Sequence, residues 1–388
     1  MVNYVSANYI YPVIAPPIKD GVIGFKSDGT ITGVYTQEEA LELNITDIRY
    51  HEGILVPGFV NTHCHLELSH LFKKIPQKTG LPAFVREIVA QREQPEEIVL
   101  SAMKEADRQM FENGIVAVGD ISNVLVSKAI KENSAIYYHT FVEVFGFDRP
   151  SKPIIDNALS ICKNFGPLPA SIVPHAPYSV SEELFTAIRN VTGFKDVLSI
   201  HNQETAAENE FFELGTGQFA QMYERLGVQK SACHGNGKNS LRYHLPQLPQ
   251  NNLLLVHNTF STKQDVDFAR KQHGFVFWCI CAHANLYIEN NLPDIEMLLN
   301  EDIKITLGTD SLASNHQLSI LAEMQVIQEH KNISFDHLIT WATLNGAKFL
   351  NIDRQYGSLQ VGKQPGINLL NIGPDLKINN HTRVMRLV

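Results

Sequence analysis

The feature that most constrains the fold of this 388-residue chain is a series of eight short apolar runs that alternate with helix-like segments. The runs predict strands at residues 54–62, 115–121, 135–144, 171–174, 197–200, 253–256, 275–280 and 303–307. Helices are expected at residues 96–113, 181–190, 317–331 and 335–350. Strands that alternate with helices form parallel sheets. Eight strand–helix repeats of this length predict an α/β fold, specifically a (β/α)8 TIM-like barrel.

The two ends of the chain have a different pattern, in which short alternating runs are separated by turn signals. Such runs occupy residues 4–10, 21–25, 367–370 and 383–386. This pattern is typical of small antiparallel strands. We therefore expect a small composite β-sandwich domain built from residues 1–52 and 357–388, with the barrel formed by residues 53–356. Residues 227–250 are the most irregular stretch and predict a long loop beside the substrate pocket.

Composition narrows the possible partners. The net charge of −9 disfavours nucleic acid and anionic membranes as partners. No apolar run approaches the roughly 18 residues of a membrane-spanning helix. The five cysteines are widely spread and odd in number, which fits a reducing compartment. We expect a cytoplasmic protein that acts on a small molecule, and the sequence leaves a homodimer open.

A His-X-His pair ends the first apolar run. Side chains alternate along a strand, so His63 and His65 project from the same side. A pair of hydrogen-bonded core histidines is one interpretation. A divalent metal is the favoured one, because imidazole nitrogen is a common ligand of such ions.

Four further apolar runs also end in a histidine or an aspartate. These residues are His175, His201, His257 and Asp310. Each alone is more often a hydrogen-bonded histidine or a helix-capping aspartate than a ligand. In a (β/α)8 barrel, however, the C-terminal ends of all strands meet on one rim, where reactive groups lie. The shared position of these residues therefore makes coincidence improbable.

This set of residues fits metal-assisted hydrolysis. His63, His65, His201 and Asp310 would supply three nitrogens and one oxygen to a divalent ion. Such an ion lowers the pKa of bound water from about 16 to about 7, so that hydroxide is available at neutral pH. Glu204, three residues after His201, is the candidate general acid. Its alternative role is that of a first-turn helix glutamate favoured by the helix dipole.

Several motifs together resemble the amidohydrolase superfamily, in its branch of nucleobase and nucleoside deaminases and triazine hydrolases. They are residues 57–65, the His201-X-X-Glu204 pair, and residues 307–311, 342–347 and 357–363. The resemblance implies that His63, His65, His201 and Asp310 bind one metal ion. It also implies that Glu204 shuttles protons to a substrate ring nitrogen, that His257 and Asp310 orient and deprotonate the attacking water, and that His175 faces the substrate.

Residues 65–71, 119–123, 143–147 and 308–315 are more narrowly similar to the aminodeoxyfutalosine deaminases of menaquinone synthesis. Residues 281–285 depart from the family pattern at the rim of the seventh strand, which bears on substrate identity. Strand four has no lysine that could bridge two ions, so the resemblance favours a one-metal site. Zinc is the expected ion and iron is the alternative.

The expected activity is hydrolytic deamination of an amino-substituted N-heterocycle, namely a 6-aminopurine nucleoside derivative such as aminodeoxyfutalosine. Metal-bound hydroxide would attack the amino-bearing carbon and ammonia would leave. Four residues are candidates to contact a ribose and a carboxylate-bearing tail, namely Glu67, His70, Arg92 and Glu143. The alternative is that they are solvated surface residues. A triazine-type chlorohydrolase or cyclic amidase on the same one-metal site is the alternative, and an inactive binding barrel is a third.

Overall fold

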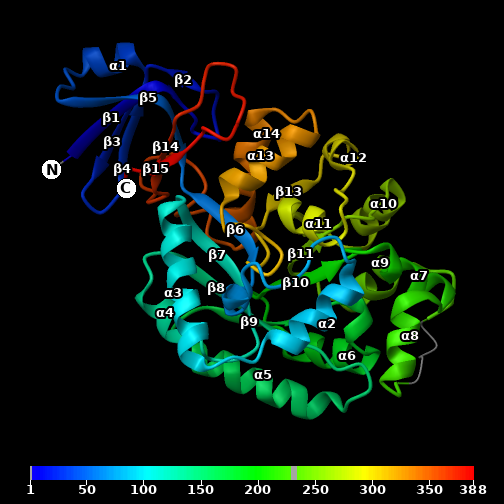
Figure 1. Ribbon diagram of the computed structural model, residues 1–388. Coiled ribbons are helices and arrows are strands. Elements are labelled where there is room, and N and C mark those ends of the chain that lie inside the picture. The colour runs from blue at the N-terminus through cyan, green and yellow to red at the C-terminus, as the bar shows by residue number, and fades with distance from the viewer. Residues whose placement is uncertain (1, 229–233) are drawn as a thin grey trace.

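The computed structural model describes residues 2–228 and 234–388 (Figure 1). Its central feature is two four-stranded parallel sheets, whose strands follow one another in chain order. The first sheet contains β6 (Phe59–Cys64), β7 (Ile115–Ser122), β8 (Tyr137–Val144) and β9 (Ala170–Pro174). The second contains β10 (Val197–Asn202), β11 (Asn252–His257), β12 (Val276–Ile280) and β13 (Lys304–Leu307). The predicted α/β class with parallel strands is thus confirmed.

Hydrogen bonds join the two sheets at both edges, near the C-terminal ends of their strands. At one edge, the backbone N–H of His201 donates to the carbonyl of His175 at 3.0 Å. At the other edge, Cys64 and Asp310 form a parallel bridge, and the N–H of Asp310 donates to the carbonyl of His63 at 3.1 Å. The strand ends that carry the predicted site residues therefore lie together.

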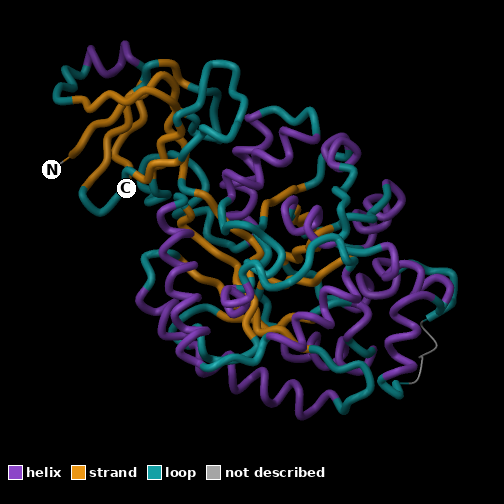
Figure 2. The backbone as a smooth tube through the Cα atoms, in the orientation of Figure 1, coloured by secondary structure: helices purple, strands orange, loops and turns teal. Residues whose placement is uncertain are grey.

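Helices follow the strands and cover their outer side, as the purple segments around the orange strands of Figure 2 illustrate. α6 (Glu182–Val191) illustrates why such a helix forms and packs against the strands. The Ser181 side chain caps its N-terminus by accepting from Leu184 N–H, and Leu184, Phe185 and Ile188 form its buried face. None of the helices in the described ranges is long and apolar enough to cross a membrane.

Further helices accompany the strands of the two parallel sheets. They are α2 (Leu81–Gln91), α3 (Glu96–Glu112), α4 (Lys128–Asn133), α5 (Ser151–Phe165), α7 (Ala206–Leu214), α8 (Gly217–Arg225), α9 (Ser240–His244), α10 (Lys263–Gln272), α11 (Ala282–Ile288), α12 (Ile295–Asn300), α13 (Ile320–His330), α14 (Phe335–Thr340) and α15 (Gly346–Phe349). The helix predicted at 335–350 contains a π-helical turn, Trp341–Asn345, between α14 and α15. α9 occupies part of the predicted loop 227–250, of which residues 229–233 lie outside the described ranges.

Segments from both ends of the chain form a third sheet. It contains β1 (Val2–Ile10), β2 (Ile18–Lys19), β3 (Val22–Lys26), β4 (Ile31–Tyr35), β5 (Ile48–Pro57), β14 (Ile367–Leu370) and β15 (Val384–Arg386). Figure 1 shows these blue and red strands side by side, with both termini and α1 (Gln37–Glu42) nearby. Strands from both ends of the chain thus lie in one sheet. Hydrogen bonds connect its strands as one sheet, so the predicted sandwich is not confirmed.

The strand predicted at residues 54–62 is in fact two strands. β5 ends at Pro57 and pairs with β1 and β14, whereas β6 begins at Phe59 in the parallel sheet. Between them, Gly58 approaches its neighbours so closely that an added Cβ would lie 2.2 Å from Val116 Cγ1. The apolar run is continuous because both strands are buried. The proposed domain division after residue 52 falls within β5.

Candidate metal centre and active site

His63 and His65 place two ring nitrogens against one carboxylate. His63 is fully buried at the end of β6 and His65 follows the strand. Their Nε2 atoms are 3.1 Å apart, and Asp310 Oδ1 lies 3.6 Å from the first and 3.4 Å from the second. Two ligands bound tetrahedrally at about 2.1 Å from one ion are about 3.4 Å apart. The spacing therefore fits ligands that surround a single metal ion.

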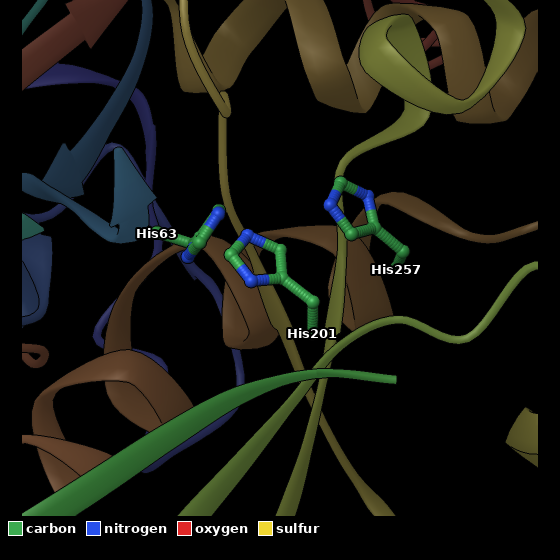
Figure 3. A group of neighbouring side chains, drawn as sticks. All are labelled: His63, His201 and His257. Carbon is green, nitrogen blue, oxygen red and sulfur yellow. The ribbon is translucent and has the colours of Figure 1, made fainter. Parts of the chain in front are cut away.

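His201 and His257 extend this cluster from the ends of β10 and β11. Figure 3 shows their rings gathered with that of His63, and one ring nitrogen of each of the three lies within 4.8 Å of the others. His201 Nδ1 bonds to the carbonyl oxygen of His175 at 2.7 Å, and His257 Nδ1 bonds to Asn285 Oδ1 at 2.9 Å. Both acceptors require N–H at Nδ1, which leaves a lone pair on each Nε2.

Backbone geometry after β13 directs Asp310 toward the histidines. Asp310 has a φ of 54° and His257 a φ of 75°, a left-handed conformation that non-glycine residues seldom adopt. At Gly308 an added Cβ would lie 2.8 Å from Cys279 Sγ and 2.9 Å from His63 Cβ. Only glycine therefore lets this turn pass behind His63.

The protonation states are those that metal ligation requires. Burial first, and then the neighbouring His63, lowers the pKa of His65 to about 3. Burial likewise lowers the pKa of His257 to about 4, although Asp310 opposes the shift. For Asp310, burial raises the pKa, but the neighbouring His63, His65 and His257 outweigh it and hold the pKa below its usual range. Neutral imidazoles and a charged carboxylate can bind a cation without first losing protons.

Glu204 lies beside this cluster, and its pKa is raised rather than lowered. It is buried, and its Oε1 is 3.6 Å from His257 Nε2. Burial, and then the charge of Asp310, raises the pKa of Glu204 well above its usual value. A protonated carboxyl beside neutral histidines is a proton donor, which is the property that a general acid needs.

Two residues of this site were not predicted from the sequence. Asn285 in α11 accepts from His257 Nδ1 and donates from Nδ2 to the His257 carbonyl at 3.3 Å. Ser314 donates from Oγ to Asp310 Oδ2 at 2.5 Å. Each follows the end of a strand, so its position at the rim was a usable signal. The contact itself depends on loop conformations that periodicity does not predict.

A cavity of about 930 Å³ opens above the histidines. Among the residues that line it are His65, His201, Glu204, His257 and Asp310. Four predicted substrate contacts also line it, namely Glu67, Arg92, Glu143 and His175. Glu143 is buried, and its Oε1 lies 3.7 Å from His201 Nδ1. Burial raises the pKa of Glu143 to about 7.

Glu67 and His70 have backbone partners. Glu67 accepts from the N–H groups of Asn123 and Val124 at 3.2 and 3.3 Å. The ring nitrogens of His70 lie 3.1 Å from the carbonyl oxygens of Glu67 and Arg92. Within the described part of the chain, His70 is not among the residues that line the cavity. In the structure the ring of His70 links two backbone segments.

Taken together, imidazole and carboxylate donors at the C-terminal ends of parallel strands, beneath a large cavity, define a metal-dependent α/β enzyme. The model of the amidohydrolase family matches residues 54–385. The chain belongs to the amidohydrolase family, as its motifs predicted, and it is a hydrolytic enzyme.

Individual relatives are distant in sequence but similar in fold. The chain is 24% identical to an adenosine deaminase of Helicobacter pylori over 82% of this chain and 79% of that protein. It is 22% identical to an aminodeoxyfutalosine deaminase of Nitratiruptor over 92% and 88%. The crystal structure of Helicobacter pylori aminofutalosine deaminase in complex with methylthio-coformycin superposes with a TM-score of 0.83 at 20% identity, covering 100% of both chains.

Proposed function

We propose that this protein is a metal-dependent hydrolytic deaminase of a 6-aminopurine nucleoside derivative, such as aminodeoxyfutalosine. The observation that carries the proposal is the Glu204–His257 pair, which lies beside the His63, His65, His201 and Asp310 donors at one end of the cavity. Deamination needs a proton donor for the ring and a proton acceptor for water within reach of one carbon atom. The pair offers both.

The architecture proposed for this activity is a closed (β/α)8 barrel at residues 53–356, with a composite β-sandwich domain from residues 1–52 and 357–388. The hydrogen bonds from His201 to His175 and from Asp310 to His63, at the two edges of the sheets, support closure.

His63, His65, His201 and Asp310 would hold the metal, which we propose to be zinc, with iron as the alternative. When bound, such an ion lowers the pKa of water so that hydroxide is available at neutral pH. The chain's own groups then handle the protons. His257 Nε2 and the Asp310 carboxylate accept the proton of the attacking water. The Glu204 carboxyl donates to the ring nitrogen next to the amino-bearing carbon.

The same groups complete the reaction. Addition of water to the ring carbon produces a tetrahedral centre that carries both hydroxyl and amino groups. The proton held at His257 or Asp310 passes to the amino nitrogen, the C–N bond breaks, and ammonia leaves. Glu204 recovers a proton from the new hydroxyl group, so that a carbonyl forms and the acid is ready for the next turnover.

The cavity supports a substrate larger than a free purine base. Its volume of about 930 Å³ is near the upper end for small-molecule sites. α2 contributes an apolar wall that includes Phe84 and Ile88. Four arginines also line it, namely Arg86, Arg92, Arg149 and Arg225. An apolar substituent that ends in a carboxylate matches this lining, because guanidinium groups bind carboxylates in a bidentate manner.

The remaining contacts are assigned by chemistry. The Glu67 carboxylate is a hydrogen-bond acceptor for ribose hydroxyls, and His175 and Glu143 line the cavity beside His201, where the base would lie. His175 Nδ1 is bonded to Ser179 Oγ at 2.7 Å, so its Nε2 is the atom left for the substrate.

The test is an assay of ammonia release by zinc-loaded protein with aminodeoxyfutalosine, S-adenosylhomocysteine, adenosine and guanine. Ammonia from a 6-aminopurine nucleoside, fastest with the acidic and apolar substituent, is the expected result. A chlorotriazine is included because the atrazine chlorohydrolase of Arthrobacter aurescens superposes with a TM-score of 0.77 at 16% identity over 99% of this chain and 95% of that one. Chloride release, with no activity toward the amino substrates, would replace the proposal with the chlorohydrolase alternative.

A further inference from the structure

The backbone that carries His63 and His65 is not held by a regular ladder on the β7 side. In the parallel pairing of β6 with β7, Asn61 lies opposite Val118 and Cys64 lies opposite Asp120. Three residues of β6 therefore span two of β7, and the register shifts between Asn61 and Cys64. A bulge of this kind leaves backbone groups without ladder partners and re-aims the side chains it carries. The segment that supplies two metal ligands needs another anchor on this side.

Asp120 supplies that anchor. Its side chain is fully buried, and Oδ1 accepts the backbone N–H of Leu66 at 2.8 Å, directly after His65. On the opposite side, the carbonyl of His63 accepts from the N–H groups of Thr309 and Asp310, each at 3.1 Å. The His63–Leu66 segment is thus fixed between the turn that carries Asp310 and the carboxylate of Asp120.

Lys131 in α4 keeps the Asp120 carboxylate in this position. Its Nζ lies 2.7 Å from Asp120 Oδ2, and both side chains are fully buried. The same Nζ donates to Ser122 Oγ and to Thr140 Oγ1, each at 3.0 Å, so all three of its protons have partners. A buried ion pair with every donor satisfied has one geometry, which fixes the orientation of Oδ1.

We infer that Asp120 and Lys131 form a positioning unit for the metal centre. Neither side chain is a ligand. Asp120 holds the N–H of Leu66 so that His63 and His65 present their Nε2 atoms 3.1 Å apart, and Lys131 holds Asp120. The inference rests on the metal site of the proposed function and extends it to two residues beyond the ligands. Partners outside the ligand set commonly affect metal affinity by 10- to 100-fold.

Two double variants separate this role from a general role in stability. Asp120→Asn/Lys131→Met removes both charges but keeps an amide oxygen for the Leu66 N–H. Asp120→Leu/Lys131→Met also removes both charges but deletes that acceptor. Replacing both members of a buried ion pair leaves no unpaired charge, so both proteins are expected to fold. Both are compared with wild type by thermal unfolding of the metal-free proteins.

The measurements are the zinc dissociation constant, by competition with a chromophoric chelator, and the visible spectrum of cobalt-substituted protein, which reports coordination. The Asn/Met variant is expected to bind zinc within about threefold of wild type, with the wild-type cobalt spectrum. The Leu/Met variant is expected to lose at least tenfold in zinc affinity, with an altered cobalt spectrum, even where its metal-free Tm equals that of the Asn/Met variant.

Equal zinc affinity in the two folded variants would overturn the positioning role while leaving the metal site intact. A wild-type protein that binds neither zinc nor cobalt would instead overturn the metal site of the proposed function, and the positioning role with it. If the Leu/Met variant does not fold, the single variant Leu66→Pro, which lacks the N–H, takes its place. Wild-type zinc affinity in folded Leu66→Pro would likewise overturn the role.

Discussion

Nε2 of His257 lies 3.6 Å from Oε1 of Glu204, and both side chains are buried at the end of the cavity. The bond between His257 Nδ1 and Asn285 leaves the Nε2 lone pair directed toward Glu204 and the metal ligands. One group is a neutral base and the other is an acid whose pKa burial has raised. The pair places a proton donor and a proton acceptor 3.6 Å apart beside the expected metal ligands, which is what the proposed deamination requires.

Glu204→Gln should remove the proton donor while preserving shape. We expect kcat/KM for the best nucleoside to fall by about 10²- to 10⁴-fold, the usual contribution of general acid–base catalysis. Zinc content should be unchanged, because Glu204 is not among the expected ligands. Steady-state ammonia release and metal analysis of the purified variant test both statements. The control is Glu213→Gln, an exposed position of α7. Full turnover in Glu204→Gln would refute the assigned role.

Asn285→Ala should impair catalysis through His257. Without the amide oxygen, nothing on that side fixes the proton at His257 Nδ1, and the ring can rotate or change tautomer. We expect kcat to fall by about 10- to 100-fold with little change in KM, and the acidic limb of the pH–rate profile to shift. Asn285→Asp, which keeps an acceptor, should recover part of the rate. A KM effect alone would indicate a substrate contact instead.

Much of this site was predictable from the sequence, because in a barrel of parallel strands the C-terminal ends of all strands lie on the same face. Each apolar run ends where its strand leaves the core, so a polar residue at that point lies on the rim. The five residues that follow this rule, His63, His65, His201, His257 and Asp310, lie as far as 247 positions apart in the chain.

The parts that were missed depend on local geometry rather than on periodicity. The pattern of apolar residues does not show that the chain passes from one sheet to another at Gly58, because the strands on both sides of Gly58 are buried. The contact of His70 with two carbonyl oxygens, rather than with the cavity, follows from how the segment after β6 folds back. The turns at His257 and Asp310 use left-handed backbone that residue type does not indicate.

Removal of the metal should lower stability as well as activity. A ligand that binds only the folded state adds about 2.7 kcal/mol when it is present at 100 times its Kd. We therefore expect chelator-treated protein to unfold at a lower temperature than zinc-loaded protein, and added zinc to restore both Tm and ammonia release. Thermal unfolding across a zinc titration measures the effect. In Asp310→Asn the zinc-dependent rise should be much smaller, and a rise equal to that of wild type would argue against Asp310 as a ligand.

Arg92→Ala should discriminate between substrates. If Arg92 binds a carboxylate on the substituent, KM for the acidic nucleoside should rise by about tenfold or more, which corresponds to about 1.4 kcal/mol. KM for adenosine, which has no carboxylate, should stay the same. Arg108→Ala is the control, because Arg108 lies on α3 in an exposed ion pair with Glu105. Equal losses for both substrates would instead assign Arg92 to the structure of the cavity wall.

Glu208 gives a pH dependence of stability that is separate from catalysis. It is fully buried in α7, its Oε1 accepts the N–H of Gln203 at 2.9 Å, and its Oε2 has no hydrogen-bond partner among the described residues. Burial raises the pKa of Glu208 to about 7 from 4.5. The folded protein therefore holds a proton that the unfolded chain has lost, and stability decreases as pH rises from about 4.5 to about 7. The upper bound of this loss is about 3 kcal/mol.

Glu208→Gln mimics the protonated side chain, so the variant should not lose this folding stability as the pH rises. The variant and wild type are expected to have similar Tm values near pH 5, and the variant should unfold at a progressively higher temperature than wild type up to pH 8. Parallel unfolding curves across this range, with a constant difference in Tm, would mean that Glu208 is already charged in the folded protein at pH 5. The exposed variant Glu213→Gln serves as the matched control and should show no pH-dependent difference, because this side chain is in contact with water in both states.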